Sequence, residues 1–189
     1  MNALVQAGGR ALAGSAAPPA MIEQKQYLTF MLGAEMFAIG ILGIKEIIEY
    51  AGLTEVPMMP ACIRGVINLR GRVVPVMDLS ARFGKPAAAF TKRTCIVIVE
   101  VETGGDSGGG GERQDMGMVV DAVNAVLEIP SSEIEPAPAF GAKIRTDFIE
   151  GMGKVNGKFV ILLNVNRVLS VEEIGALGKV GEAAQLLPA

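Results

Sequence analysis

The residue types that most often carry catalysis or hold metals are scarce in this chain. The sequence contains no histidine, and Cys62 and Cys95 are its only cysteines. The chain therefore lacks a histidine base for a catalytic triad or a proton shuttle. Two scattered thiols cannot complete a zinc site. We interpret both cysteines as small buried hydrophobic residues, because nothing in the sequence supports a disulfide between them.

A glycine-rich segment, residues 104–111, is the candidate for a phosphate-binding loop. It contains four consecutive glycines but no basic residue, and no Gly-Lys-Ser/Thr sequence follows it. Four glycines in succession are costly to order. We therefore interpret the segment as a mobile loop, and we predict a chain with no catalytic residue, no cofactor and no metal.

Arg70 and Glu46 are the charged residues best placed for recognition. Arg70 stands at a turn or strand end, where its planar guanidinium could hold a carboxylate or backbone carbonyls in a bidentate way. Glu46 interrupts an apolar stretch that includes Ile44 and Ile47. These isoleucines are either core residues or contacts for a partner, and Arg70 is either a contact or a structural tie between loops. We expect an apolar groove, rimmed by Glu46 and Arg70, that suits a partner helix.

Three small or polar neighbours of Arg70 are expected to shape the backbone around it. Gly65 and Gly71 suit positions with positive φ or a close approach of two chain segments. Asn68 is expected to fix the loop by a hydrogen bond.

Strand-like segments dominate the regions that must position these residues. Alternation at period two, as in Met36–Ile41, and runs of β-branched residues, as in Cys95–Val101, are typical of β-strands. Arg70-Gly71-Arg72 and Asn156-Gly157 lie between apolar runs and predict hairpin turns. Further strands are expected over Tyr27–Leu32, Ile44–Glu49, Val66–Leu69, Val73–Met77, Met116–Val120, Val123–Ile129 and Phe159–Leu163.

Helices are expected to be few and short. Asp78 is suited to cap a helix of one or two turns that ends at Gly84, and Asn164 precedes a second. A capping box at Ser170 predicts a C-terminal helix. About ten short strands with so little helix predict an all-β barrel or sandwich.

A weak internal repeat of the strand pattern, referred to below as the internal echo, suggests two β units. Ile44–Glu49 matches the pattern of Val123–Glu128, and Val73–Met77 with its capping residue matches Phe159–Leu163. We divide the chain into a flexible tail (1–21), a domain of two five-stranded units (22–93 and 94–176) and a C-terminal tail (177–189). Units of this size are marginal alone, so they are expected to pack around a shared core with a binding seam between them.

Composition and charge limit the location and the partners. Half of the residues are hydrophobic, yet the longest apolar runs are too short to cross a bilayer, and the N-terminus shows no apolar signal segment. We therefore predict a cytoplasmic protein with no direct membrane insertion. The net charge of −3 argues against nucleic acid as a partner. Counting Lys and Arg against Asp and Glu, residues 22–93 have a net charge of 9 − 6 = +3 and residues 94–176 have one of 6 − 13 = −7. This difference is either ordinary surface variation or a sign of two faces for two partners of different charge.

A long motif resembles the signature of CheW-like domains. Residues 63–71 read Ile-Arg-Gly-Val-Ile-Asn-Leu-Arg-Gly, and residues 73–79 read Val-Val-Pro-Val-Met-Asp-Leu. The family pattern is approximately I-x-G-x-x-N-L-R-G-x-x-[IV]-P-[IV]-x-D-L. The segments 37–47, 116–123 and 149–164 also resemble the family, so the likeness covers about residues 25–176. The long glycine loop and Asn164, where an Asp is usual, are departures.

The resemblance implies two five-stranded SH3-like barrels and a non-enzymatic adaptor. Such proteins couple chemoreceptors to the histidine kinase CheA, binding the receptor's cytoplasmic hairpin tip and the regulatory domain of the kinase at membrane-associated arrays. The receptor site is predicted to include Ile44, Glu46, Ile47, Gly65, Asn68 and Arg70, and no kinase-binding residue is assigned. A coupling protein of another motility or surface-sensing pathway, an isolated kinase regulatory domain and a small barrel enzyme are the alternatives.

Overall fold

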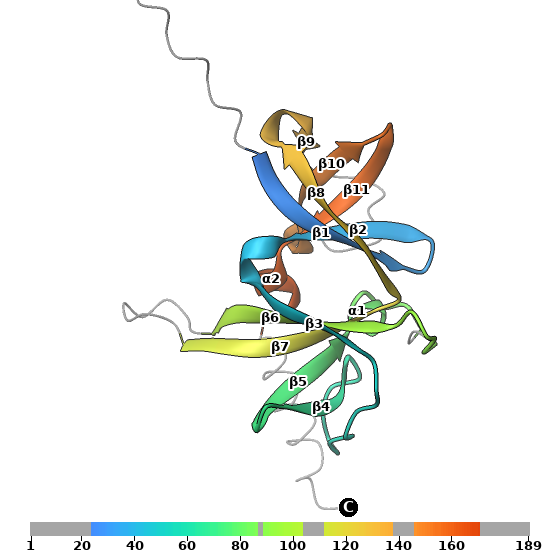
Figure 1. The fold of residues 1–189 in the computed structure, drawn as a ribbon, viewed down its shortest axis with the longest axis vertical. Coiled ribbons are helices and arrows are strands. Elements are labelled where there is room, and N and C mark those ends of the chain that lie inside the picture. Colours follow the sequence, from blue (N-terminus) through green and yellow to red (C-terminus); the bar gives the residue numbers. More distant parts are fainter. Residues whose placement is uncertain (1–23, 87–88, 104–111, 138–145, 171–189) are drawn as a thin grey trace, which may run out of the picture.

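The computed structural model describes residues 24–86, 89–103, 112–137 and 146–170, and these form two β-sheets with few short helices (Figure 1). The predicted tails 1–21 and 177–189, the loop 104–111 and the predicted helix after Ser170 lie outside the described residues. Among the described residues, no helix is long and apolar enough to cross a membrane.

One sheet has six strands and occupies the upper part of Figure 1. Its spatial order is β8 (Ala122–Pro130), β1 (Gln24–Leu32), β2 (Glu35–Gly40), β11 (Lys158–Leu163), β10 (Ile149–Val155) and β9 (Ile134–Glu135). Neighbours in this sheet are antiparallel except for β2 and β11, which run parallel.

The second sheet has five strands and lies below the first in the same view. Its order is β3 (Ile44–Glu49), β6 (Cys95–Thr103), β7 (Glu112–Val120), β5 (Arg72–Asp78) and β4 (Ile63–Leu69). Here β5 and β7 form the parallel pair. The short helical elements are η1 (Ile41–Gly43), α1 (Leu79–Arg82), η2 (Ser131–Glu133), η3 (Thr146–Phe148) and α2 (Val165–Val168).

Each sheet curls into a barrel. In the five-stranded sheet a bridge between Thr54 and Val66 ties the chain after β3 to β4, the opposite edge. In the six-stranded sheet β9 follows β8 through η2 and pairs with β10, so the two ends of the sheet are also joined. Each barrel encloses its own small apolar cluster, for example Val76 and Ile98 in one and Tyr27 and Leu162 in the other.

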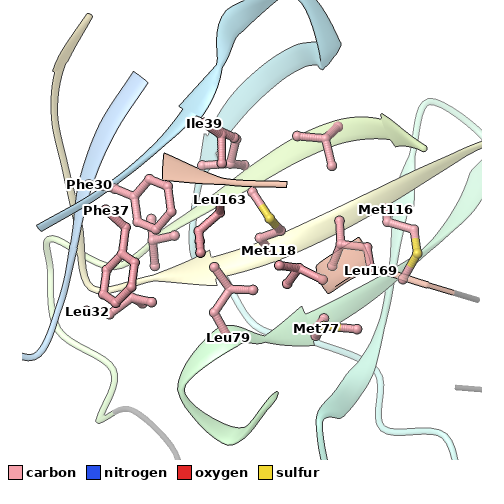
Figure 2. Close-up of a cluster of buried hydrophobic side chains, with 14 of the residues drawn as sticks. Phe30, Leu32, Phe37, Ile39, Met77, Leu79, Met116, Met118, Leu163 and Leu169 are labelled. Atoms are coloured by element: carbon pink, nitrogen blue, oxygen red, sulfur yellow. The ribbon is translucent and has the colours of Figure 1, made fainter. Parts of the chain in front are cut away.

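A larger apolar core lies between the barrels and is shared by both. Strand alternation places Ile96 and Ile98 inside the five-stranded barrel, whereas Val97 and Val99 point to the shared core. Aromatic rings of the six-stranded barrel and methionines of the five-stranded barrel meet there (Figure 2). The all-β, two-barrel prediction with a shared core is therefore confirmed.

Neither barrel is confined to one of the two predicted units. Strands β1 and β2 of the first unit pair with β8 and β11 of the second, while β6 and β7 of the second unit join β3 and β5 of the first. The exchange corrects the expectation of units that are continuous in sequence. Four pairings carry the exchange, the antiparallel pairs β1–β8 and β3–β6 and the parallel pairs β2–β11 and β5–β7. The parallel strands cannot be joined by a tight turn, so they need partners far along the chain.

The internal echo is visible in the strand pairing. Hairpins β4–β5 and β10–β11 begin 149 − 63 = 86 residues apart, and each has a register shift after its first residue. β3 pairs with β6 as β8 pairs with β1, each with a register shift at the corresponding place. Each strand of the five-stranded barrel thus has an equivalent in the six-stranded barrel, which allows positions in them to be compared.

Local signals placed the caps and turns correctly. The Asp78 Oδ1 atom accepts hydrogen bonds from the backbone N–H groups of Ser80 and Ala81 at 2.9 and 3.3 Å, so Asp78 caps α1. Asn164 Oδ1 accepts from Arg167 N at 3.2 Å and caps α2. Asn156 and Gly157 have φ of 50° and 77°, as a tight hairpin turn requires. Cys62 is buried as predicted, whereas Cys95 is only half-buried, and both are free thiols.

Candidate recognition site

The β4–β5 hairpin holds Arg70 at its tip. Arg70 and Gly71 form a two-residue turn with φ of 53° and 82°, and Leu69 pairs with Arg72 on either side. Asn68 Oδ1 accepts a hydrogen bond from Gly71 N at 2.9 Å. Asn68 therefore fixes the turn, as the sequence predicted, and the turn directs Arg70 outward with 80% of its side chain exposed.

Gly65 is required by the close approach of a neighbouring segment. Its φ is 154°, and it stands beside the register shift of β4. A Cβ atom at this position would overlap the backbone carbonyl of Thr54. The same carbonyl accepts a hydrogen bond from Val66 N at 2.9 Å, which is part of the bridge that closes the barrel.

Arg70 and Glu46, the two predicted charged residues, are in direct contact. Arg70 Nη2 lies 2.8 Å from Glu46 Oε2. Glu46 is much less exposed than Arg70, at 23% of its side chain, so its carboxylate lies beneath the guanidinium. The contact joins the tip of the β4–β5 hairpin to β3. Because β3 and β4 are the two edge strands of the sheet, the ion pair connects opposite edges of the barrel.

Lys45, next to Glu46, is the centre of a second group of ion pairs. Its Nζ lies 2.9 Å from both Glu100 Oε2 and Asp115 Oδ1. Asp115 also contacts Arg72 at 3.4 Å, and Glu100 contacts Arg113 at 3.1 Å. The two groups together bind β3, β6, β7 and the β4–β5 hairpin at one end of the barrel.

The ion pairs shift two pKa values. Hydrogen bonds to Glu100 and Asp115 raise the pKa of Lys45 above its ordinary value, because the charged ammonium is stabilised. The hydrogen bond from Lys45 lowers the pKa of Glu100 for the same reason. Both groups therefore remain charged over a wide range around neutral pH.

The predicted isoleucines lie in different environments. Ile44 packs against the shared core, Ile47 is 42% exposed, and Ile48 packs against the barrel's own cluster. A groove of about 430 Å³ runs between the end of β3 and β4, and Ile48, Leu53, Ile67 and Asn68 are among its lining residues. The Arg70–Glu46 pair stands beside this groove without lining it. All six predicted site residues thus belong to the five-stranded barrel, and Glu46 and Arg70 pair within that barrel rather than across the seam.

The equivalent end of the six-stranded barrel has different chemistry. Ala125 and Asn156 occupy the places of Glu46 and Arg70, and Lys158 occupies that of Arg72. These residues border an apolar groove of about 720 Å³, which Met31, Met36, Leu127 and Phe159 also line. Among the described residues, the ion pairs that tie the β4–β5 hairpin to β3 and β7 therefore have no counterpart at the equivalent positions of the six-stranded barrel, where Glu35 beside the groove pairs with Lys85 instead.

Sequence reasoning missed Lys45, Arg72, Glu100 and Asp115. The available signal was the presence of charged residues inside apolar strands, as with Glu100 in the run from Cys95 to Val101. That signal marks a residue as unusual but does not name its partner, because the partners come from four different strands. Within the described ranges, no three His, Cys, Asp or Glu residues are grouped to hold a metal.

The fold and the site together define an all-β protein of two SH3-like barrels, one of which carries a group of ion pairs at one end. The family model of the CheW-like domain matches residues 26–173. The chain is 31% identical to the chemotaxis protein CheW of Klebsiella aerogenes over 159 residues, covering 84% of this chain and 90% of that protein. It is 33% identical to the chemotaxis protein CheW of Bacillus subtilis, covering 78% and 88%. The solved structure of the scaffolding protein TtCheW from Thermoanaerobacter tengcongensis superposes with a TM-score of 0.68 at 34% identity, covering 79% of this chain and 94% of that one. The chain belongs to the CheW-like domain family.

Proposed function

We propose that this protein is a non-enzymatic adaptor that couples methyl-accepting chemoreceptors to the histidine kinase CheA. The observation that carries the proposal is the match to the CheW-like domain across residues 26–173, which includes every described strand except the first residues of β1. The CheW family is a non-catalytic scaffold. Its members couple receptors with the kinase, and the same role follows for this chain.

Two protein partners fit this function. One is the cytoplasmic hairpin tip of a chemoreceptor, and the other is the regulatory domain of the kinase, which is itself CheW-like. The adaptor would act in the cytoplasm as a domain of residues 22–176, recruited to receptor arrays at the membrane. Neither nucleic acid nor direct insertion into the membrane is part of this role.

The receptor site is proposed at the end of the five-stranded barrel. Arg70 offers an exposed guanidinium, and Glu46 holds it in place at 2.8 Å. Ile47 adds a partly exposed apolar surface, and Ile44 supports β3 from the shared core. Gly65 and Asn68 act indirectly, since they set the backbone that presents Arg70. A helical receptor tip could lay its apolar face beside the guanidinium at such a site.

Reconstitution tests the proposal. The purified chain is mixed with a CheA kinase and a receptor-tip fragment from the same genome, and kinase autophosphorylation is followed with each component left out in turn. We expect receptor-dependent activation only when this protein is present. Kinase activity and complex formation that do not change when the protein is added would remove the assignment.

A further inference from the structure

The β4–β5 hairpin carries a second exposed arginine close to Arg70. Arg72 follows the turn and keeps 68% of its side chain exposed. Its Nη1 lies 3.4 Å from Asp115 Oδ2, and the Asp115 carboxylate is only 10% exposed. Both arginines are therefore anchored on recessed carboxylates while their guanidinium groups face solvent.

This arrangement leaves donors available on both guanidinium groups. Each guanidinium has five N–H donors in a planar fork, and among the described residues each of these two groups has one carboxylate partner. The carboxylates of Glu46 and Asp115 partly neutralise the two guanidinium groups. They also restrict the arginine side chains before binding, so less conformational entropy is lost when a partner binds. Two such forks on one hairpin match carboxylates better than lysines would, because the guanidinium binds carboxylates bidentately.

An exposed apolar side chain stands next to Arg72, on the same hairpin as the two arginines and their ion pairs. Val73, next to Arg72, is 72% exposed, and its cross-strand partner is Asn68. A partner side chain that reaches the arginines would therefore also cover an exposed valine. Such a mixture of charged forks around an apolar contact is typical of protein interfaces.

The equivalent hairpin of the six-stranded barrel lacks these features. Asn156 and Lys158 stand where Arg70 and Arg72 do, and the anchoring places of Glu46 and Asp115 are taken by Ala125 and Met36. An anchored pair of arginines is thus not a consequence of the hairpin itself.

We infer that Arg70 and Arg72 together form a two-arginine docking point for a carboxylate-rich surface of the receptor tip. The inference rests on the adaptor function proposed above. It adds Arg72 to the site and gives the chemistry of the partner surface. It assigns Asp115 and Lys45 a positioning role, because Lys45 holds the carboxylate on which Arg72 rests.

The test measures binding of a receptor-tip fragment to the full chain and to its Arg72→Ala, Arg72→Lys and Lys158→Ala variants, at two salt concentrations. Lys158→Ala is the matched control, since it removes one positive charge from the equivalent hairpin position. Arg72→Ala is expected to fold, because Lys45 still neutralises Asp115, and a thermal melt of each variant checks this.

We expect Arg72→Ala to weaken receptor binding by about tenfold, Arg72→Lys to weaken it less, and Lys158→Ala to leave it within about twofold of the unchanged chain. The salt dependence of binding should become shallower in Arg72→Ala, which loss of a purely structural contact would not produce. A folded Arg72→Ala variant that binds as tightly as the unchanged chain overturns the docking point alone. An unchanged chain that binds no receptor tip overturns the adaptor function and the docking point together. Sedimentation with phosphatidylglycerol vesicles is measured for the same variants. Loss of vesicle binding in Arg72→Ala, with receptor binding intact, would overturn the inference in favour of a lipid surface.

Discussion

The guanidinium of Arg70 lies 2.8 Å from the carboxylate of Glu46, and this contact connects the tip of the β4–β5 hairpin to β3. The two residues are 24 positions apart in the sequence. Because Arg70 is 80% exposed, the ion pair itself should add little to folding stability. Its importance is expected to lie in holding Arg70 in one orientation for a partner.

Replacing Arg70 with asparagine should separate binding from folding. Asparagine tolerates the positive φ of this position, as Asn156 shows in the equivalent hairpin. We expect Arg70→Asn to change the free energy of unfolding by no more than about 1 kcal/mol. Receptor-tip binding should fall by about tenfold or more, since the guanidinium is lost. Denaturant melts and a pull-down measure the two effects, and Asn156→Ala is the control for a turn substitution elsewhere. Binding that survives in a folded Arg70→Asn variant would exclude Arg70 from the receptor site.

Gly65→Ala should be strongly destabilising. The added Cβ atom would overlap the Thr54 carbonyl, and the φ of 154° is unfavourable for any residue with a side chain. We expect a loss of about 3 kcal/mol or more in the free energy of unfolding, because the backbone bridge that closes the barrel must move. Gly71→Ala is the comparison, since a Cβ atom there meets nothing within 4 Å and only the positive φ is strained. That variant should lose about 1–2 kcal/mol. Equal losses in urea titrations of the two variants would show that the approach of Thr54 is unimportant.

Lys45→Gln should alter how stability depends on pH. The pKa of Lys45 is raised in the folded state, so its contribution is complete below the ordinary value of 10.5 and is lost as the pH rises through the higher folded value. The pKa of Glu100 is lowered, so its contribution is complete above the ordinary value of 4.5 and is lost as the pH falls through the lower folded value. The stability difference between the unchanged chain and Lys45→Gln should therefore be largest between these limits and shrink outside them. Denaturant titrations across the pH range measure it, with Lys158→Gln as the control. A difference that is constant with pH would contradict this account of the ion pairs.

Phe37→Ala should weaken the union of the two barrels. Phe37 is fully buried in the shared core, and its ring centroid lies 6.1 Å from that of Phe30 and 5.8 Å from that of Phe83. Removing the ring should lower the free energy of unfolding by about 3–5 kcal/mol, because a cavity remains in a packed interior. Phe159→Ala removes the same group from a side chain that is 53% exposed and should cost much less. Calorimetry of both variants tests the ranking, and similar melting temperatures would contradict the proposed importance of the shared core.

Much of the local structure could be predicted because short-range chemistry determines it. A two-residue turn of type I′ needs positive φ at both positions, so the Asn156-Gly157 pair identified its hairpin. Asp78 and Asn164 precede helices and offer oxygens to unpaired backbone N–H groups, so the caps were also foreseen. The role of Asn68 follows in the same way, since its partner is only three residues away.

The sequence by itself determined the all-β class, the hairpins, the caps and the family, because these depend on alternation, turn chemistry and a contiguous motif between Ile63 and Leu79. Only the tertiary structure decided which strands share a barrel and which charges meet. The pairs β1–β8, β2–β11, β3–β6 and β5–β7 join segments that no local pattern links, and together they exchange strands between the two halves of the chain. Lys45, Arg72 and Asp115 meet for the same reason. A charged residue carries no mark of its partner in the sequence, since an ion pair is selected by the distance that the whole fold imposes.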